Sequence, residues 1–280
     1  MQYTRLEVIG RLKKSIDNGE CIVTAGAGIG LSAKFAERGG ADLIVIYNSG
    51  RYRMTGFSSW SGYLPIGDAN EIVLQMGERE ILPVVKEAPV IAGVFASDPT
   101  REMDHFLKQV KDLGFSGVTN FPTITLLEGA FRDNMESSGL GFSREVDMVR
   151  KAGELDLYTM VYVFTPNQAE EMARAGADCV IAHMGNTAGG SVGQEGGVPP
   201  LDDAVIRTKA IAEAALKVNP EIVTLCHGGP IAMPEDAAYV IERTGVHGFV
   251  GASSIERLPV EKPLTEATRA FKKIPINISK

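Results

Sequence analysis

The stretch ADCVIAHMG at residues 177–185 is the clearest indication of the fold, since an apolar run ends there in a histidine and a glycine turn. A segment with helical periodicity follows it at 201–220. Seven other β-rich runs end in a turn in the same way: 21–28, 41–50, 89–98, 115–122, 157–166, 221–229 and 247–254. Their apolar cores are nearly continuous, which is typical of parallel strands covered on both faces.

Helical segments alternate with these runs, for example at 98–114 and 165–177. Eight strand–helix units suit a (β/α)8 barrel, which typically needs about 250 residues. We therefore predict an α/β fold in which residues 1–280 form a single TIM-barrel domain. Residues 4–19 are expected to form an extra N-terminal helix that closes the bottom of the barrel. An open, doubly wound sheet is the alternative, because a count of units does not establish closure.

The composition excludes several classes of function. Among 280 residues, 28 Lys and Arg stand against 35 Asp and Glu, which gives a net charge of −7. An acidic chain without a basic run is unsuited to nucleic acid or to an anionic membrane surface. No apolar run approaches the roughly 20 residues that span a bilayer, and the charged start does not resemble a signal peptide. We expect a cytoplasmic protein.

Two further features argue against a disulfide framework and a nucleotide site. Cys21, Cys179 and Cys226 are an odd number of cysteines within apolar runs, which predicts reduced and buried thiols. The glycine-rich TAGAGIGLSAK at 24–34 matches neither the P-loop pattern nor GxGxxG. We interpret it as a tight turn after the first strand and expect no nucleotide or flavin cofactor.

Long connections follow the second, fourth and sixth strands, at 51–69, 123–142 and 186–200. Long loops in a compact domain usually carry function, and in a barrel these three lie at the C-terminal face. The loop at 185–200 is rich in glycine, and Glu195 is its only ionisable side chain. It is a candidate lid; a disordered insertion is the alternative.

An anion site is expected where the seventh and eighth strands end. The turns CHGGP at 226–230 and GASSIER at 251–257 can direct backbone N–H groups and hydroxyls at one oxyanion. The candidates are Gly228, Gly229, Gly251, Ser253 and Ser254. Ordinary turn glycines are the alternative explanation.

His183 and His227 each end a strand, where a histidine faces the ligand of a barrel and can transfer protons near neutral pH. A supporting role in the core would explain the same positions. Arg51 and Arg53 follow the second strand and could clamp a carboxylate or phosphate in two-point fashion. Exposure on a long loop is the alternative for both arginines.

The sequence resembles a known family in five segments. These are residues 24–73, GVTNFPT at 117–123, IAHMG at 181–185, CHGGP at 226–230 and GASSIERLP at 251–259. They are similar to the phosphoenolpyruvate hydrolase-like TIM-barrel family, some members of which are described as phosphonopyruvate hydrolases or as signal-transduction barrels. A related barrel forms the C-terminal part of plant tobamovirus-resistance proteins.

The wider resemblance is to the phosphoenolpyruvate mutase and isocitrate lyase superfamily. It implies that Asn48, Ser49 and Gly50 hold the carboxylate or phosphoryl end of the substrate, and that Asp68 lies near a metal-bound oxygen. The superfamily follows its third strand with an Asp-x-Asp pair that holds Mg²⁺ and ends its fourth with a Glu.

This chain departs from that pattern. It has Gly93 and Phe95 in place of the pair, with Asp98 three residues on, and Asn120 in place of the Glu. Asp68 and Asp98 are then the candidate ligands of a possible Mg²⁺.

The resemblance implies a hydrolase or lyase that acts on a small phosphorylated or phosphonylated 2-oxo acid through an enolate-like intermediate. In this hypothesis His183 or His227 moves protons, Asn120 donates to the enolate oxygen, and Asp98 or Asp68 orients water or metal. A ligand-binding sensor without catalysis is the first alternative, and a sugar-phosphate synthase or isomerase is the second. We also expect a homo-oligomer, because barrels of the superfamily commonly associate.

Overall fold

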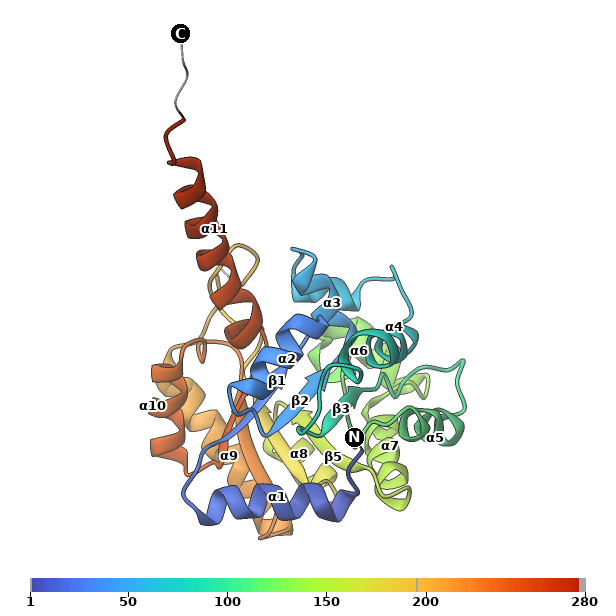
Figure 1. Cartoon of the computed structure of the whole chain (residues 1–280). Helices are drawn as coiled ribbons and strands as arrows, with labels where there is room; N and C mark the ends of the chain where they lie inside the picture. Colours follow the sequence, from blue (N-terminus) through green and yellow to red (C-terminus); the bar gives the residue numbers. More distant parts are fainter. Residues whose placement is uncertain (1, 195, 277–280) are drawn as a thin grey trace.

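The computed structural model describes residues 2–194 and 196–276, in which eight parallel strands close a barrel (Figure 1). Each strand pairs with its neighbours in sequence order, and β8 pairs with β1. The strands are β1 (Ile22–Gly26), β2 (Leu43–Ile46), β3 (Val90–Gly93), β4 (Gly117–Thr119), β5 (Tyr158–Val163), β6 (Cys179–His183), β7 (Val223–His227) and β8 (Gly248–Gly251). The predicted (β/α)8 barrel is confirmed, and an open sheet is excluded.

Helices surround the barrel and form most of the connections at its rim (Figure 1). The longer ones are α1 (Arg5–Asp17), α2 (Gly30–Arg38), α3 (Asn48–Met54), α4 (Ala69–Met76), α5 (Met103–Asp112), α6 (Gly129–Ser137), α7 (Phe142–Glu154), α8 (Pro166–Arg174), α9 (Leu201–Val218), α10 (Pro234–Thr244) and α11 (Leu258–Lys272). Four single-turn elements are η1 (Ser59–Tyr63), η2 (Gly77–Ile81), η3 (Ile124–Leu126) and η4 (Ser253–Arg257).

The expected N-terminal helix is α1, and Figure 1 shows it across the lower end of the barrel. Thr4 caps the helix and exchanges hydrogen bonds with Glu7, which defines its start. Val8 and Leu12 are buried against the strands. The guanidinium of Arg5 donates to both carboxylate oxygens of Asp178, just before β6. Apolar packing and this ion pair together fix the helix on the barrel floor.

Closure of the barrel depends on small residues between β8 and β1. Ile22 pairs with Gly248, and Ala25 pairs with Gly251. A Cβ atom at Gly248 would lie 2.0 Å from the carbonyl oxygen of Ile22, so no side chain fits there. Glycine therefore lets the first and last strands approach closely enough to pair.

Several local expectations were wrong. Asn48, Ser49 and Gly50 were expected at the end of the second strand, but they begin α3 because β2 ends at Ile46. The connections at 51–69 and 123–142 contain the helical elements η1, η3 and α6 and are not extended loops. Cys21 is exposed, since it precedes β1 at the barrel floor, whereas the other two thiols are buried as predicted.

Across residues 2–194 and 196–276, no helix is both long and apolar enough to cross a bilayer.

The helix expected over residues 98–114 is shorter than predicted, because α5 begins only at Met103. Asp98 accepts hydrogen bonds from the N–H and the hydroxyl of Thr100, which forms a turn ahead of that helix.

Replacement of Gly248 by valine should prevent β8 from pairing with β1, because the new Cβ would overlap a backbone carbonyl. We expect a loss of about 3 kcal/mol in the free energy of unfolding, measured by urea denaturation. Gly10→Ala in α1 is the control: a Cβ there meets nothing within 4 Å, so it should raise stability by up to about 1 kcal/mol. Equal stability of the two variants would contradict this account of closure.

Candidate functional site

A small pocket lies at the C-terminal end of the barrel, where the strands end. Its volume is about 40 Å³, which is room for a few water molecules or a very small ligand. The residues that line it come from the last positions of β6 and β7 and from the connections after β2, β4, β6 and β8. The polar ones central to its chemistry are Ser49, Arg53, His183, His227 and Ser253. We call this the central pocket.

His183 and His227 lie side by side because they are register partners at the ends of β6 and β7. Their ring centroids are 4.7 Å apart in an edge-to-face arrangement. Tyr162 of β5 packs against both, at 5.1 Å from the ring of His183 and 5.2 Å from that of His227. The sequence predicted both histidines at strand ends, and the structure brings them together in one pocket.

Burial lowers the pKa of both imidazoles. The pKa of His183 falls well below the ordinary value because of burial and the neighbouring His227. For His227, burial outweighs a hydrogen bond to Val250 and lowers the pKa to about 4. Both rings are therefore neutral at pH 7, and neither is a cation for an anionic ligand.

The hydrogen bonds of the two rings assign opposite tautomers. The Nδ1 atom of His183 accepts from the N–H of Gly185 at 2.9 Å, which leaves the proton on Nε2. The Nδ1 atom of His227 lies 2.7 Å from the carbonyl oxygen of Val250 and donates to it, which leaves Nε2 as an acceptor. The pair thus offers one donor and one acceptor to a ligand.

Arg53 supplies the positive charge in the wall of the central pocket. Its side chain is 2% exposed and pairs with Glu256, which is 1% exposed. The Nε atom donates to the carboxylate at 2.7 Å, and Nη2 donates to the same oxygen. Burial lowers the pKa of Arg53, but Glu256 more than offsets this, so the guanidinium stays charged. Nη1 has only a long contact, 3.4 Å to Ser59.

Ser49 provides an unpaired hydroxyl in the same wall. Its side chain is buried, and its Oγ has no hydrogen-bond partner within residues 2–194 and 196–276. Buried hydroxyls normally have partners, so an orphaned one that lines a pocket points to a ligand. Ser253 lines the pocket from η4. These two serines are the predicted substrate-binding residues that the structure places with the histidines.

The other predicted anion-binding residues lie outside the central pocket. The N–H of Gly229 donates to the carbonyl of Gly185 and so is not free for an anion. Gly228 and Gly229 instead adopt left-handed backbone conformations that pack this turn onto the β6–α9 connection. Gly251 stays within β8, and the buried Ser254 hydroxyl does not line the pocket.

Asn48, Gly50 and Arg51 support the rim and do not line the central pocket. Asn48 donates through Nδ2 to the carbonyl of Gly62, which ties α3 to η1. A Cβ at Gly50 would lie 3.0 Å from the Cα of Gly28, so this glycine allows two connections to touch. The guanidinium of Arg51 pairs with Glu80 and is directed away from the pocket.

Asn120 has no hydrogen left for an enolate oxygen, which contradicts its predicted role as a donor. Its Nδ2 atom donates to Glu145 at 2.6 Å and to the carbonyl of Tyr162 at 3.0 Å. Its Oδ1 accepts from the N–H of Tyr162 at 2.7 Å. Asn120 is a buried structural group behind the pocket wall.

The proposed metal ligands Asp68 and Asp98 hold an arginine. Arg101 donates to Asp68 at 2.7 Å and lies 3.2 Å from Asp98. The remaining oxygen of Asp98 accepts twice from Thr100. In the part of the chain described, no three His, Cys, Asp or Glu residues cluster as a metal site. The residues present therefore do not fit Mg²⁺, since the guanidinium satisfies these carboxylates.

Glu195, the predicted lid residue, lies outside the described residues. Its flanking loop is fastened to the start of α11. Ser191 donates to Glu261 through its N–H and its hydroxyl, and Arg257 donates to the carbonyl of Gly189. The loop residues Gly185, Asn186 and Thr187 line the central pocket.

Sequence reasoning missed Glu256 and Glu145, the two buried carboxyl groups behind the site. Glu256 lies within the turn GASSIER at 251–257, and Glu145 lies just after the connection at 123–142. Glutamate among small and apolar residues was the available signal, but its partner could not be found from the sequence. Asp98 and Asn120 were correctly placed near the rim, and their hydrogen-bond partners exclude the roles assigned to them.

Comparison with known proteins identifies relatives over almost the entire chain. The profile of phosphoenolpyruvate hydrolase-like proteins matches residues 7–274. The tomato (Solanum lycopersicum) ToMV susceptible protein tm-1(GCR26) and ToMV resistance protein Tm-1(GCR237) are each 53% identical over 271 residues. These matches cover 96% of this chain and 36% of each tomato protein. The chain thus spans little more than a third of these curated relatives.

Solved structures share the fold at low identity. A 2,3-dimethylmalate lyase superposes with a TM-score of 0.61 at 15% identity, covering 100% of this chain and 92% of the lyase. A phosphonopyruvate hydrolase in complex with oxalate and Mg²⁺ superposes with a TM-score of 0.57 at 16% identity, covering 95% and 87%. At this identity the likeness establishes the barrel and nothing about its chemistry.

The depressed pKa of His227 should make stability depend on pH. The fold favours the neutral ring, so its contribution is present above the ordinary pKa of 6.5 and is lost as pH falls toward about 4. Between pH 7 and pH 4 this residue should cost about 3 kcal/mol in the free energy of unfolding.

His227→Asn keeps a donor for Val250 but cannot titrate, so urea denaturation should show a smaller loss of stability for it at pH 4. His105→Asn on the exposed side of α5 is the control and should behave like the unmodified protein. Equal acid sensitivity of all three proteins would show that His227 is not buried as described.

Proposed function

Because the chain belongs to the phosphoenolpyruvate hydrolase-like family, we propose that it acts on a small 2-oxo acid or on a phosphorylated or phosphonylated relative. The reaction class is cleavage of a C–P, O–P or C–C bond with an enolate-like intermediate. The central pocket would bind the substrate. The observation that supports this most strongly is the presence of one buried guanidinium beside two neutral histidines of opposite tautomer.

In this proposal the substrate carboxylate binds to Arg53 and Ser49. A guanidinium has five N–H donors, and three of them have partners among the described residues. The remaining donors and the unpaired hydroxyl of Ser49 can hold a carboxylate. Ser253 closes the same wall from η4. The pocket is small, which favours an acid of about two to four carbons.

The histidines would then act on the reacting atoms. For phosphonopyruvate, the oxygen of water attacks phosphorus, the electrons of the P–C bond pass to the pyruvate enolate, and carbon takes up a proton. The Nε2–H of His183 can donate to the enolate oxygen as its charge develops. The free Nε2 of His227 can accept a hydrogen from the attacking water and orient it. A neutral imidazole stabilises the enolate without having to release a full proton.

The phosphonopyruvate hydrolase that shares this fold holds oxalate and Mg²⁺ in its crystal structure. Here the nearest carboxylates, Asp68 and Asp98, are bound to Arg101. The proposed reaction therefore includes no step that uses a metal ion.

A second candidate function is a ligand-binding sensor that lacks catalysis. The observation in its favour is the ion pairing of Arg101 with Asp68 and Asp98. A barrel whose carboxylates bind an arginine in place of a metal cation keeps its pocket but lacks a cation that could activate the substrate. The sensor would bind the same small acids through Arg53 and Ser49. Ligand binding without turnover distinguishes it from the enzyme.

We also propose that the chain forms a homo-oligomer through α11. Figure 1 shows this helix projecting from the barrel, and its apolar side chains Val260, Leu264 and Phe271 are exposed. An apolar groove of about 700 Å³ lies between α2 and the base of α11, lined in part by Leu31 and Phe35. A second copy of the chain has the same helix face and the same groove, so the α11 face of each copy can pack into the groove of the other.

The substrate proposal predicts turnover. Purified protein incubated with phosphonopyruvate, phosphoenolpyruvate or oxaloacetate should release pyruvate, phosphate or oxalate, and Mg²⁺ or EDTA should change the rate little. Oxalate binding by calorimetry is the parallel measurement. Binding of oxalate without turnover of any compound would favour the sensor, and the absence of both would remove the substrate claim.

Arg53→Lys should weaken oxalate binding by about tenfold or more, because an ammonium cannot bond Glu256 and a carboxylate in the two-point geometry of a guanidinium. Arg51→Lys, two residues earlier, is the matched control: its partner Glu80 lies outside the central pocket, so its affinity for oxalate should equal that of the unmodified protein. Equal affinities of the two variants would show that Arg53 does not hold the ligand.

The association of two copies should depend on the apolar face of α11. Leu264→Asp places a charge in the groove, and light scattering after gel filtration should then show a smaller particle. Lys262→Asp, on the opposite face of the same helix and outside the groove, is the control for changed charge. A monomeric unmodified protein would contradict the proposal.

A further inference from the structure

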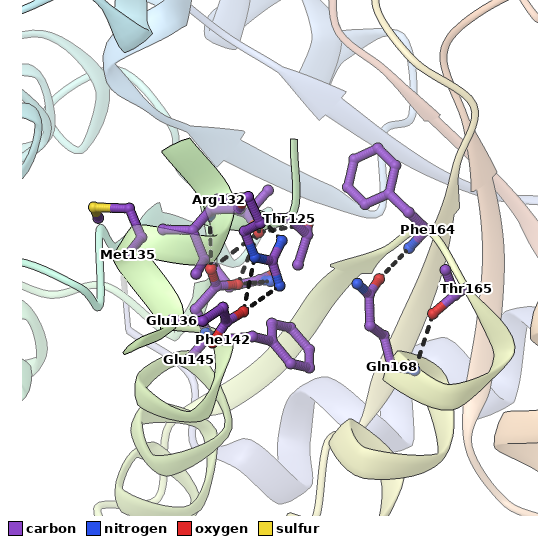
Figure 2. Close-up of polar contacts among 12 residues, drawn as sticks. Thr125, Arg132, Met135, Glu136, Phe142, Glu145, Phe164, Thr165 and Gln168 are labelled. Carbon is purple, nitrogen blue, oxygen red and sulfur yellow. Dashed lines mark hydrogen bonds and ion pairs between the residues drawn. The ribbon is translucent and has the colours of Figure 1, made fainter. Parts of the chain in front are cut away.

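Glu145 is a buried carboxyl group that the chemistry above does not use. It lies on α7, where Figure 2 labels it, and its side chain receives hydrogen bonds from three groups of the segment after β4. Asn120 donates to Oε2 at 2.6 Å, the N–H of Ile124 donates to Oε1 at 2.9 Å, and the hydroxyl of Thr123 lies within 3.0 Å of both oxygens. Glu145 is only 1% exposed, so these three donors take the place of the water that would otherwise hydrate its carboxyl group.

Asn120 transmits this contact to the barrel interior. Its amide group pairs with both the N–H and the carbonyl of Tyr162, as a neighbouring strand would. The β4–β5 ladder itself extends only to the pairing of Val118 with Thr159. Asn120 therefore extends that ladder up to the tyrosine whose ring packs on both His183 and His227.

Thr123 transmits the contact to the outer wall of the pocket. Its N–H donates to the hydroxyl of Tyr63 at 3.1 Å, and that hydroxyl lies 3.3 Å from the Thr123 carbonyl. The Tyr63 ring packs on Phe121 at 5.7 Å and on Trp60 at 5.8 Å. Tyr63, Phe121 and Trp60 all line the central pocket, and we call them the aromatic wall.

We propose that Glu145 is a positioning residue for the central pocket: through Asn120 and Thr123 it holds Tyr162 and the aromatic wall in place around the two histidines. This inference rests on the proposed function, in that the pocket is taken to bind the small acid. Glu145 itself makes no contact with the ligand. Its effect is on the positions of the aromatic wall, of Tyr162 and of the two histidine rings.

The hydroxyls beside Glu145 let its hydrogen bond with Thr123 reverse direction when the carboxyl group takes up a proton. Burial raises the pKa of Glu145 to about 7, although the hydrogen bonds from Asn120, Ile124 and Thr123 act to lower it. The hydroxyl of Thr123 lies 2.7 Å from that of Thr125, and either can donate. An ionised Glu145 accepts from Thr123, whereas a protonated one can donate to it while Thr123 turns its hydrogen to Thr125.

Two other groups face Glu145. Arg132 of α6 lowers the pKa of Glu145 through its charge, and the charge of Glu145 in turn contributes to the raised pKa of Tyr63. Arg132 itself pairs with Glu136 and donates to the carbonyl of Ile124, as Figure 2 shows. Neither histidine of the pocket titrates near pH 7, since burial lowers the pKa of both. A transition near pH 7 in the pocket can therefore be assigned to Glu145.

Trp60 is the single tryptophan of the chain and lines the pocket, so its fluorescence reports on the aromatic wall without any ligand. In the unmodified protein its emission should change with a midpoint near pH 7. Glu145→Gln should abolish that midpoint, because an amide cannot ionise. Glu145→Leu should shift the emission to longer wavelength at every pH and weaken oxalate binding by about tenfold or more.

Three controls separate positioning from general loss of stability. Glu154→Gln makes the same exchange at an exposed site on α7. Arg5→Ala removes an ion pair at the barrel floor and should lower the melting temperature while the Trp60 emission stays as in the unmodified protein. Thr123→Val removes only the relaying hydroxyl and should displace the pH midpoint, which provides a test if Glu145→Leu fails to fold.

Emission and pH profile like those of the unmodified protein in both Glu145→Gln and Thr123→Val would overturn the inference. So would a shift of the same size in Arg5→Ala, because the effect would then be general. Failure of the unmodified protein to bind oxalate would instead count against the proposed function, and the ligand-free Trp60 measurement would still decide the role of Glu145.

Discussion

The buried ion pair between Arg53 and Glu256 is the constraint on which the rest of the site depends. Two charges removed from water are stable only when they face each other and their other hydrogen bonds are made. Glu256 meets this condition by accepting from Arg53 and from the N–H of Gly28. One contact therefore joins the connections after β1, β2 and β8 and fixes a guanidinium in the pocket wall. Loss of either partner would leave the other charge buried and unpaired.

The barrel could be predicted from the sequence because its signals are local. A strand such as CVIAH is covered on both faces, so its apolar run identifies it without knowledge of its neighbours. The same logic placed His183 and His227 correctly, since a histidine that ends a parallel strand stands at the C-terminal rim of a barrel. Register pairing of β6 with β7 then brought the two rings together.

The partners of charged and amide side chains could not be predicted, because they are distant in the sequence. Arg53 and Glu256 are 203 positions apart, and Arg101 reaches Asp68 across 33. Nothing in the sequence shows that Arg101 would neutralise both Asp68 and Asp98, or that Asn120 would give both hydrogens to Glu145 and Tyr162. The residues expected at the rim are there, but their hydrogen bonds determine which remain available for a ligand.

The charge balance of the central pocket narrows the class of ligand. Among the described residues that line it, Arg53 is the one cation, and Glu256 already neutralises it. With both histidines neutral, a ligand bound as proposed would be held by directed hydrogen bonds from Arg53, Ser49 and His183 more than by net positive charge. Such a site is suited to a planar carboxylate or an enolate, whose charge is spread over few oxygens. A phosphoryl group with two charges would be less well compensated in the same volume.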